Sequence, residues 1–410
     1  MSIKLVDGGQ DQQWLKPTSN WPASRSKLKW PFDAESHMNK PIGEDAVYID
    51  AKFYLDGNND PHNLHLFTPN HEHIVNPTLS DAQVPFYGCA GTGSCFPPVG
   101  RCSGTFLVQD QGLPAGPCHY PFDYIVPETG TTVGDFTNTD SPSSWTLPDL
   151  NSDYFYSTGG FARCIAGGPI YGGAFSRQTP IKGMADEDFN GKYGGSGIQM
   201  RGGSIKLEDI TRTDDWIPHV GMIWMRPYSY YMNRSTLNAE SRWPARYSDA
   251  SWSKYPSGPG ESIYWEPYNL PSSFIPAIKM GCLLAIPKTE TANSVGIQTE
   301  LGLKIFNMLQ DYGAYTCNES GFNSSFNRMA LSTQKEAAQE VIDKYGHQMG
   351  YDSIRATNPL YPPAGSDWRR WMEDMMAMHQ KLHVVDDNSQ TNIGGAGTLR
   401  FRPPAPPFSD

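Results

Sequence analysis

Short runs that alternate apolar and polar residues recur along the chain up to residue 298. Residues 46–55 alternate and are followed by the turn residues Asp56-Gly-Asn-Asn-Asp. Residues 220–225 and 280–286 are short apolar runs, and Pro287 stops the second. Alternation and short apolar runs bounded by turn residues are typical of β-strands. The pattern therefore predicts several short strands, some of them buried on both faces.

Helical spacing begins only at residue 299. Thr299 is a candidate N-cap for a helix with apolar residues at 301, 305, 308 and 309, and Gly313 is expected to end it. Residues 332–345 and 366–379 predict two further helices, the second with Ser366 as its N-cap. Because strands come first and helices last, we expect a mainly β fold. It would be a β-sandwich or jelly-roll-like core with two or three helices in the C-terminal third.

The same patterns divide the chain into four parts. Residues 1–45 show little periodicity and are expected to form an extended N-terminal arm. Residues 46–298 form a β-rich core that contains a Cys/Gly loop at 86–120, and residues 299–383 form a helical portion packed on it. Residues 384–410 are a Gly/Pro-rich tail that either packs as a strap or stays loose.

Composition agrees with a turn-rich β protein and excludes some partners. The 410 residues include 40 Gly, 34 Pro, 11 Trp and 21 Tyr, which suits many turns between aromatic-rich strands. The net charge of −11 argues against a nucleic-acid partner, which requires a basic surface. No run reaches the roughly 18 apolar residues of a membrane span.

The location of the protein is predicted from its cysteines and its first residues. Four cysteines within a loop of Gly and Pro favour local disulfides, and a further pair could form a third bridge: Cys89, Cys95, Cys102 and Cys118, then Cys164 with Cys317. A zinc site is the alternative, although no CxxC pair is present. Cys282 lies in an apolar run and is expected to be a buried thiol. The first residues lack the apolar core of a signal peptide, so the chain is either cytosolic or a mature secreted form, and the cysteines favour an extracellular location.

Histidines cluster in one short segment. Four imidazoles and two carboxylates fall within fourteen residues and could bind a divalent metal, Ca²⁺ or Zn²⁺: His62, His65, His71 and His73, with Asp60 and Glu72. The alternative is a polar surface loop in which the histidines are incidental.

A second group of polar residues lies in the Gly-rich segment 192–219. Tyr193 or His219 could act as base or acid, while Arg201 or Lys206 neutralises an acidic group of the substrate. Glu208 and Asp209 could supply glycosidase carboxylates, but adjacent residues on a strand point to opposite faces and cannot form that pair alone. In the alternative interpretation, the glycines are β-bulges and His219 is a hydrogen-bonded core histidine.

Aromatic residues follow between 224 and 268, and some of them are expected to stack on sugar rings. Trp224 and Trp243, with Lys206, are the candidate substrate-binding residues. No serine-hydrolase elbow, HExxH motif or dinucleotide fingerprint occurs, so covalent serine hydrolysis and nicotinamide chemistry are not expected.

Several motifs, in order, resemble one family of proteins. Residues 192–208 resemble a His-Gly-Gly-Ser-Gly-Leu-Ser run followed by Gly-Gly-Thr-Ile-Arg-Leu-Gly-Glu-Leu. Four later segments resemble Ile-x-His-Ala-Leu, Arg-Trp-Pro-Ala, Met-Gly-Ser-Leu-Leu-Ala-Leu-Pro and Leu-Gln-Asp-Tyr-Gly-Ala-Tyr: they start at Ile217, Arg242, Met280 and Leu309. The closing Gly-rich and Ala-Pro-Pro segments also match. This poorly characterised family consists of secreted bacterial, often marine, proteins, and the resemblance covers roughly residues 140–410.

The resemblance implies an extracellular function, with polysaccharides as the expected substrates, and names no reaction. This chain retains the family's residues at His219, Asp249 and Asp311. The histidine of the family's first motif is replaced by Tyr193, and its usual acidic residue after the Tyr-Gly-Ala-Tyr motif is replaced by Asn318. Our first hypothesis is a polysaccharide lyase or glycoside hydrolase with Tyr193, Arg201, His219 and Asp249 as the catalytic set. The second is a structural or glycan-binding subunit of an extracellular assembly such as a surface layer, filament or virion. The third is a metal-dependent enzyme that uses the histidine cluster.

Overall fold

The structure is a computed structural model of the chain. It describes residues 21–51, 53, 70–72, 80–84, 86–88, 118–119, 145–148, 154–158, 165–172, 178–185, 196–199, 201–225, 241–246, 248, 278–319, 329–347, 349 and 362–409. All statements below concern this part of the chain.

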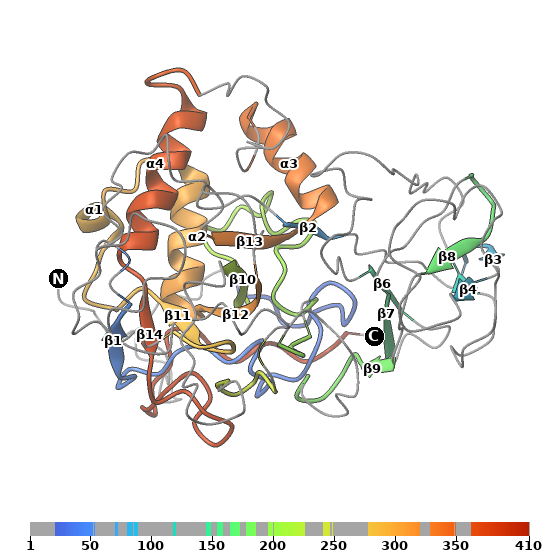
Figure 1. Ribbon diagram of the computed structural model, residues 1–410, viewed down its shortest axis with the longest axis horizontal. Helices are drawn as coiled ribbons and strands as arrows, with labels where there is room; N and C mark the ends of the chain where they lie inside the picture. Colours follow the sequence, from blue (N-terminus) through green and yellow to red (C-terminus); the bar gives the residue numbers. More distant parts are fainter. Residues whose placement is uncertain are drawn as a thin grey trace, which may run out of the picture.

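The described elements are fourteen short strands and four helices (Figure 1). The strands are β1 Tyr48–Asp50, β2 Asn70–Glu72, β3 Gln83–Val84, β4 Phe86–Gly88, β5 Cys118–His119, β6 Trp145–Pro148, β7 Tyr154–Thr158, β8 Ile170–Gly172, β9 Gln178–Pro180, β10 Gly221–Met225, β11 Leu283–Ala285, β12 Ala314–Glu319, β13 Met329–Gln334 and β14 His383–Val385. The helices are α1 Ala292–Val295, α2 Glu300–Asp311, α3 Lys335–Tyr345 and α4 Asp367–Gln380.

A mixed sheet forms the centre of the fold, with strand order β1-β14-β11-β12-β10-β13-β2. Two of its pairings are parallel, β10 with β12 and β13 with β2, and the others are antiparallel. Every residue of β10, β11 and β12 is buried, so the middle of this sheet must be covered on both faces. Smaller sheets pair β3 with β5, β4 with β8, and β7 with β6 and β9.

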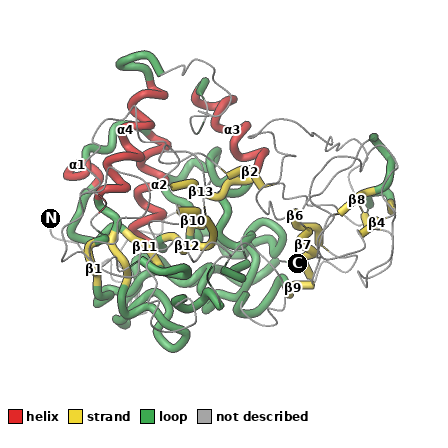
Figure 2. Tube along the Cα trace, in the orientation of Figure 1, coloured by secondary structure: helices red, strands yellow, loops and turns green. Residues whose placement is uncertain are grey.

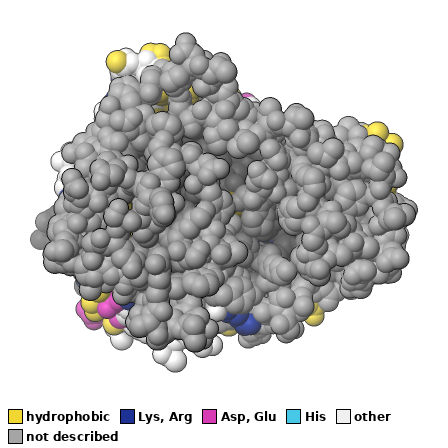
Figure 3. Space-filling view, in the orientation of Figure 1, with side chains coloured by type: hydrophobic (Ala, Val, Ile, Leu, Met, Phe, Trp, Pro, Cys, Tyr) yellow, Lys and Arg dark blue, Asp and Glu magenta, His cyan; other side chains and the backbone are white. Residues whose placement is uncertain are grey.

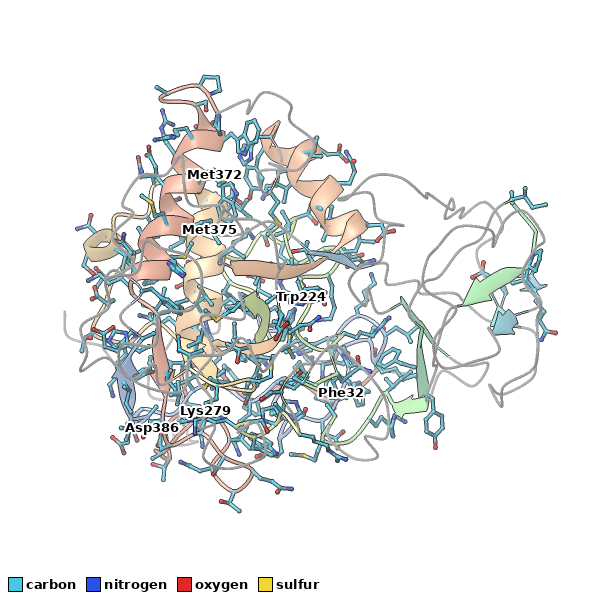
Figure 4. All side chains as sticks on the ribbon, in the orientation of Figure 1. Phe32, Trp224, Lys279, Met372, Met375 and Asp386 are labelled. Atoms are coloured by element: carbon cyan, nitrogen blue, oxygen red, sulfur yellow. The ribbon has the colours of Figure 1, made fainter. Side chains whose placement is uncertain are left out.

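Helices cover one face of the central sheet (Figure 1). A Cβ added to Gly221 of β10 would lie 2.9 Å from the Met308 side chain of α2, so α2 lies directly against the middle strands. Met372 and Met375 of α4 are buried on the same side (Figure 4). The Thr299 side chain caps α2 by accepting from Gly302 N–H, as predicted, and Ser366 caps α4 in the same way through Arg369 N–H.

Irregular segments cover the opposite face, where loops fill the lower half of Figure 2. His37 contacts the ring of Tyr315 on β12, and a Cβ on Gly203 would lie 2.6 Å from Met222 of β10. Phe32 and Met38 are fully buried, and Phe32 lies on the side of the sheet away from α4 (Figure 4). We call residues 30–42, 196–199 and 201–210 together the coil layer.

The two terminal segments pair with each other beside the coil layer. Arg25 and Phe408 form a parallel bridge, and Gly43 and Arg400 form an antiparallel one. The Arg402 side chain reaches α2, where its Nε lies 2.7 Å from Asp311 Oδ2 in an ion pair that is buried on both sides. The tail thus packs as a strap, and its first two residues, Val384 and Val385, belong to β14 of the central sheet.

The fold confirms the prediction of a β-rich protein in its coarse form and corrects details. Strands β12 and β13 lie inside the portion predicted to be helical, and the helix predicted from residue 332 begins at Lys335 because residues 332–334 belong to β13. Residues 204–210 alternate in sequence but form turns, with one bridge from Ile205 to Thr333. Within the described ranges, no second sheet packs face to face on the central one.

The buried Asp311–Arg402 pair predicts a large effect of one substitution. Arg402→Met leaves the Asp311 carboxylate buried without its Arg402 partner, and we expect a loss of about 3–5 kcal/mol in the free energy of unfolding. Urea denaturation measures it. The matched control is Arg370→Met, which removes an exposed pair with Asp367 on α4 and should cost less than about 1 kcal/mol. Equal urea midpoints for the two variants would contradict a structural role for Arg402.

Candidate functional site

His219 lies immediately before β10 and is the centre of a buried polar cluster. Its Nδ1 is 2.7 Å from the Val220 carbonyl oxygen, and its Nε2 is 3.0 Å from Asp209 Oδ2. Both partners are hydrogen-bond acceptors, so a neutral ring donates to one of them and a protonated ring donates to both. His219 is only 1% exposed.

Asp209 is held by the turn that precedes it. Its Oδ2 accepts from the Lys206 backbone N–H at 2.7 Å as well as facing His219, while Lys206 Nζ donates to the Gly202 carbonyl at 3.0 Å. Burial acts to raise the pKa of Asp209, but the charges and hydrogen bonds of His219 and Lys206 outweigh it and lower that pKa overall. Burial and the Lys206 charge lower the pKa of His219, against the pull of Asp209. Asp209 is therefore a carboxylate at neutral pH.

The chemistry open to this cluster is proton exchange within the His219–Asp209 pair. A general acid or base must also lie within hydrogen-bond reach of a substrate atom. Both ring nitrogens of His219 are engaged by the protein itself, and the side chains of His219 and Asp209 are only 1% and 11% exposed. In this conformation the pair therefore orders the turn 206–209 against β10, as the alternative interpretation of a hydrogen-bonded core histidine predicts.

The other described candidates are also built into the interior. Arg201 is fully buried, its guanidinium lies 4.0 Å from the Phe155 ring centroid, and its Nη2 donates to the Leu28 carbonyl at 2.8 Å. Lys206 and Trp224 are 3% and 2% exposed. Trp243 is half-buried, and its ring packs edge to face against the His37 ring with 5.2 Å between the ring centroids. Arg201, Lys206 and His219 share the coil layer and its junction with β10, whereas Trp224 lies on β10 and Trp243 on a separate turn.

The remaining predicted residues are placed only in part. Tyr193, Asp249, His62, His65 and His73 lie outside the described residues. His71 lies in β2, where it pairs in register with Thr333 of β13. Within the described ranges, no group of three or more His, Cys, Asp or Glu residues is arranged to hold a metal. The predicted Ca²⁺ or Zn²⁺ site therefore stays a prediction.

The structure places two of the predicted cysteines in the interior: Cys317 on β12, and Cys282 directly before β11. Cys317 is buried on β12, where its Sγ is 3.5 Å from the Ile223 carbonyl oxygen, and its predicted bridge to Cys164 stays a prediction. Cys164, Cys89, Cys95 and Cys102 lie outside the described residues, and only the backbone of Cys118, in β5, is described. Cys282 is a buried thiol, as predicted, and burial raises its pKa to about 11.

Two residues of interest were missed by the sequence. Asp209 was considered only as a partner of Glu208, because nothing in a spacing of ten residues shows that a turn brings it back to His219. His37 lies in a segment without periodicity, yet it is 2% exposed and neither ring nitrogen has a hydrogen-bond partner among the described residues.

A second polar group lies where the parallel strands β10 and β12 end. Trp224 pairs in register with Asn318, and Met225 pairs with Glu319. Asn318 and Glu319 are 2% and 4% exposed, and Trp224 Nε1 has no hydrogen-bond partner in the described part of the chain. Carboxyl ends of neighbouring parallel strands are a common place for binding sites in α/β sheets. In the sequence, Asn318 is marked by the family resemblance and by the Asn-Glu-Ser glycosylation motif that it begins.

As for the membrane, the described helices include none that is both long and apolar enough to span one.

The ordering role of Asp209 predicts a pH-dependent loss of stability. Asp209→Asn should cost about 1.5–3 kcal/mol at pH 7, since it removes charge-assisted hydrogen bonds. Because the pKa of Asp209 is lowered in the folded state, its contribution is present above pH about 4 and is lost as the pH falls through the folded pKa. The difference from the wild type, measured by urea denaturation, should therefore shrink between pH 5 and pH 3.

Glu208→Gln is the matched control, because Glu208 is adjacent and forms an exposed ion pair with Lys29. It should change stability little at either pH. A constant Asp209→Asn deficit down to pH 3 would contradict the assigned ionisation.

Comparison with known proteins adds no relative: no protein-family model, curated protein or solved structure matches the chain.

Proposed function

We propose that the protein is a structural or glycan-binding subunit of an extracellular assembly, such as a surface layer, filament or virion. The observation that carries this proposal is the burial of the candidate catalytic residues that the structure describes. Arg201 and His219 are 0% and 1% exposed and bond to backbone carbonyls or to Asp209. Such contacts support a scaffold role for the polar motif in place of a catalytic one.

A second observation supports self-association. β1 is a terminal strand of the central sheet. Ile49 in β1 is 38% exposed, and Val47, directly before the strand, is 51% exposed. Figure 3 shows hydrophobic and acidic side chains together at the lower left, the position of β1 in Figure 1. Edge strands with exposed apolar residues are templates for pairing with another chain. The partner proposed for this edge is a second copy of the protein.

The extracellular location and the finer fold remain proposals with separate support. The cysteine cluster at 89–118 and the family resemblance favour secretion. The small sheets β3–β5, β4–β8 and β6–β7–β9 favour further β-structure between residues 83 and 180, as a β-sandwich or jelly-roll core requires.

Self-association through β1 predicts the effect of a charged edge. The double variant Val47→Lys/Ile49→Lys should lower the mass measured by light scattering at working concentration, because lysines on an edge strand oppose pairing. The matched control is Ile342→Lys on α3, a residue with similar exposure (39%) away from the edge. A wild type that runs as a sharp monomer at all concentrations would count decisively against the assembly.

A polysaccharide lyase or glycoside hydrolase is the second candidate, favoured by the polar group at the ends of β10 and β12. Trp224 there presents an indole N–H without a described partner, beside Asn318 and Glu319. The Trp224 ring suits sugar binding on one face of the sheet, while the Glu319 carboxylate, which points to the other face, suits acid or base chemistry at the strand end.

This second candidate predicts activity on a panel of algal and bacterial polysaccharides. The wild type should release reducing ends or unsaturated products, and Glu319→Gln should reduce the rate at least 100-fold, the contribution typical of a general acid or base. Asn318→Asp, which restores the acidic residue typical of the resembling family, serves as the matched comparison at the neighbouring position. If neither the wild type nor Asn318→Asp forms products, the enzyme candidate is wrong and the assembly proposal is left standing.

A further inference from the structure

His37 occupies an apolar box in the coil layer. Its ring packs edge to face against the rings of Trp243 and of Tyr315 on β12, with distances of 5.2 Å and 5.5 Å between ring centroids. It is 2% exposed, and neither Nδ1 nor Nε2 has a hydrogen-bond partner among the described residues. A buried polar group without a partner is uncommon in folded proteins. Burial without a hydrogen-bond partner therefore favours the neutral imidazole over the charged one.

His37 and His219 lie at one junction and differ in their surroundings. The Val220 N–H donates to the Met38 carbonyl at 3.0 Å, so the residue after His219 is joined to the residue after His37. A second proton on His219 would find the Val220 carbonyl or the Asp209 carboxylate as acceptor. A second proton on His37 would find no carboxylate at its ring nitrogens among the described residues, and only the Met184 carbonyl lies near enough to favour it, without a formed hydrogen bond.

The coil layer also depends on contacts that act together. Phe32 has a left-handed backbone with φ 68°, which is unfavourable for a bulky residue. Three hydrogen bonds hold it in place. Its N–H donates to the Ile181 carbonyl, and its own carbonyl accepts from the Arg25 and Asn39 side chains. The 0% exposed Phe32, Met38 and Ile42 side chains fill the same face of the sheet. Loss of one anchor in this segment therefore loosens its neighbours.

We propose that the coil layer opens in mild acid and that His37 is the residue that senses the proton. In the closed state the imidazolium ion is disfavoured, because the ring is buried away from water and neither ring nitrogen has a hydrogen-bonded acceptor among the described residues. Once the layer opens, His37 reaches water and takes up a proton freely. Acid therefore favours the open state, which exposes the apolar underside of the central sheet around Met222 and Tyr315.

The charged groups around His37 do not reverse the expected effect of pH on the opening of the coil layer. On its own segment, Glu35 and Lys40 pair with each other. Beside Trp243, Arg242 pairs with Asp386 at 2.5 Å, and the Tyr315 hydroxyl faces Asn388. Burial lowers the pKa of His37 to about 3, with a smaller opposing effect from the Met184 carbonyl on the segment that also carries Lys182.

The expected size of the effect follows from linkage. The folded pKa lies below the ordinary value of 6.5, so the closed state has full stability above pH about 6.5 and loses it as the pH falls. Between pH 6 and pH 4 the opening equilibrium should rise about tenfold per pH unit. Between pH 7 and pH 4 the total is roughly 300-fold for one proton bound only in the open state.

Hydrogen exchange measured by mass spectrometry on the full chain tests this inference. Peptides covering residues 30–42 should lose protection in the wild type from pH 7 to pH 4, after correction for intrinsic exchange rates. In His37→Phe the loss should be at least tenfold smaller, because phenylalanine fits an apolar box and binds no proton. The matched control is His347→Phe, at a half-buried position after α3, which should behave as the wild type.

A second measurement on the unmodified protein keeps the inference testable if His37→Phe does not fold. Exchange at the imidazole C2 position reports both the pKa and the accessibility of each histidine. His37 should exchange slowly, with no titration near pH 6.5 in the closed state. An ordinary titration of His37 near pH 6.5, or an acid loss of protection that is unchanged in His37→Phe, would overturn the proposal.

Discussion

The central sheet needs cover on both faces, and the described helices supply it on only one. β10 and β12 are buried throughout, with Met308 of α2 against one side and the rings of the coil layer against the other. Irregular backbone that covers a sheet carries its own N–H and C=O groups into the interior, where each needs a partner. Much of the remaining structure can be understood as the means by which these groups are satisfied.

Long cationic and amide side chains meet that need. Arg25 donates to the carbonyls of Pro406, Trp30 and Phe32, and Asn39 donates to those of Pro31, Phe32 and Asp33. Lys304, on α2, donates to the carbonyls of Arg212 and Asp214. Arg201 and Lys206 follow the same rule with Leu28 and Gly202. Polar residues in a Gly-rich segment are thus explained by a buried coil, and they need no substrate to account for them.

Local features of the fold could be predicted from the sequence, and non-local ones could not. Thr299 and Ser366 were identifiable as N-caps because a cap and its helix lie within one turn of each other. β12 was hidden because its six residues follow a helix directly, and their burial on both faces removes the alternation that marks a strand. Residues 204–210 alternate as a strand would, but Asp209 closes a turn by accepting from Lys206 N–H, and the chain turns away after one bridge.

The candidate site also shows that the sequence identifies polar residues without showing what they contact in the fold. The sequence identified Arg201, Lys206 and His219 as polar residues out of place in an apolar setting, and the structure does bring them to one layer. Residue type alone does not distinguish a group that faces a substrate from one that faces a carbonyl. His37 and His219 make the difference concrete, since one imidazole has two acceptors and the other has none at its ring nitrogens among the described residues. A buried histidine is therefore defined by the groups around it. Those of His219 lie within ten residues along the chain, whereas the rings around His37 come from Trp243 and Tyr315 in distant segments.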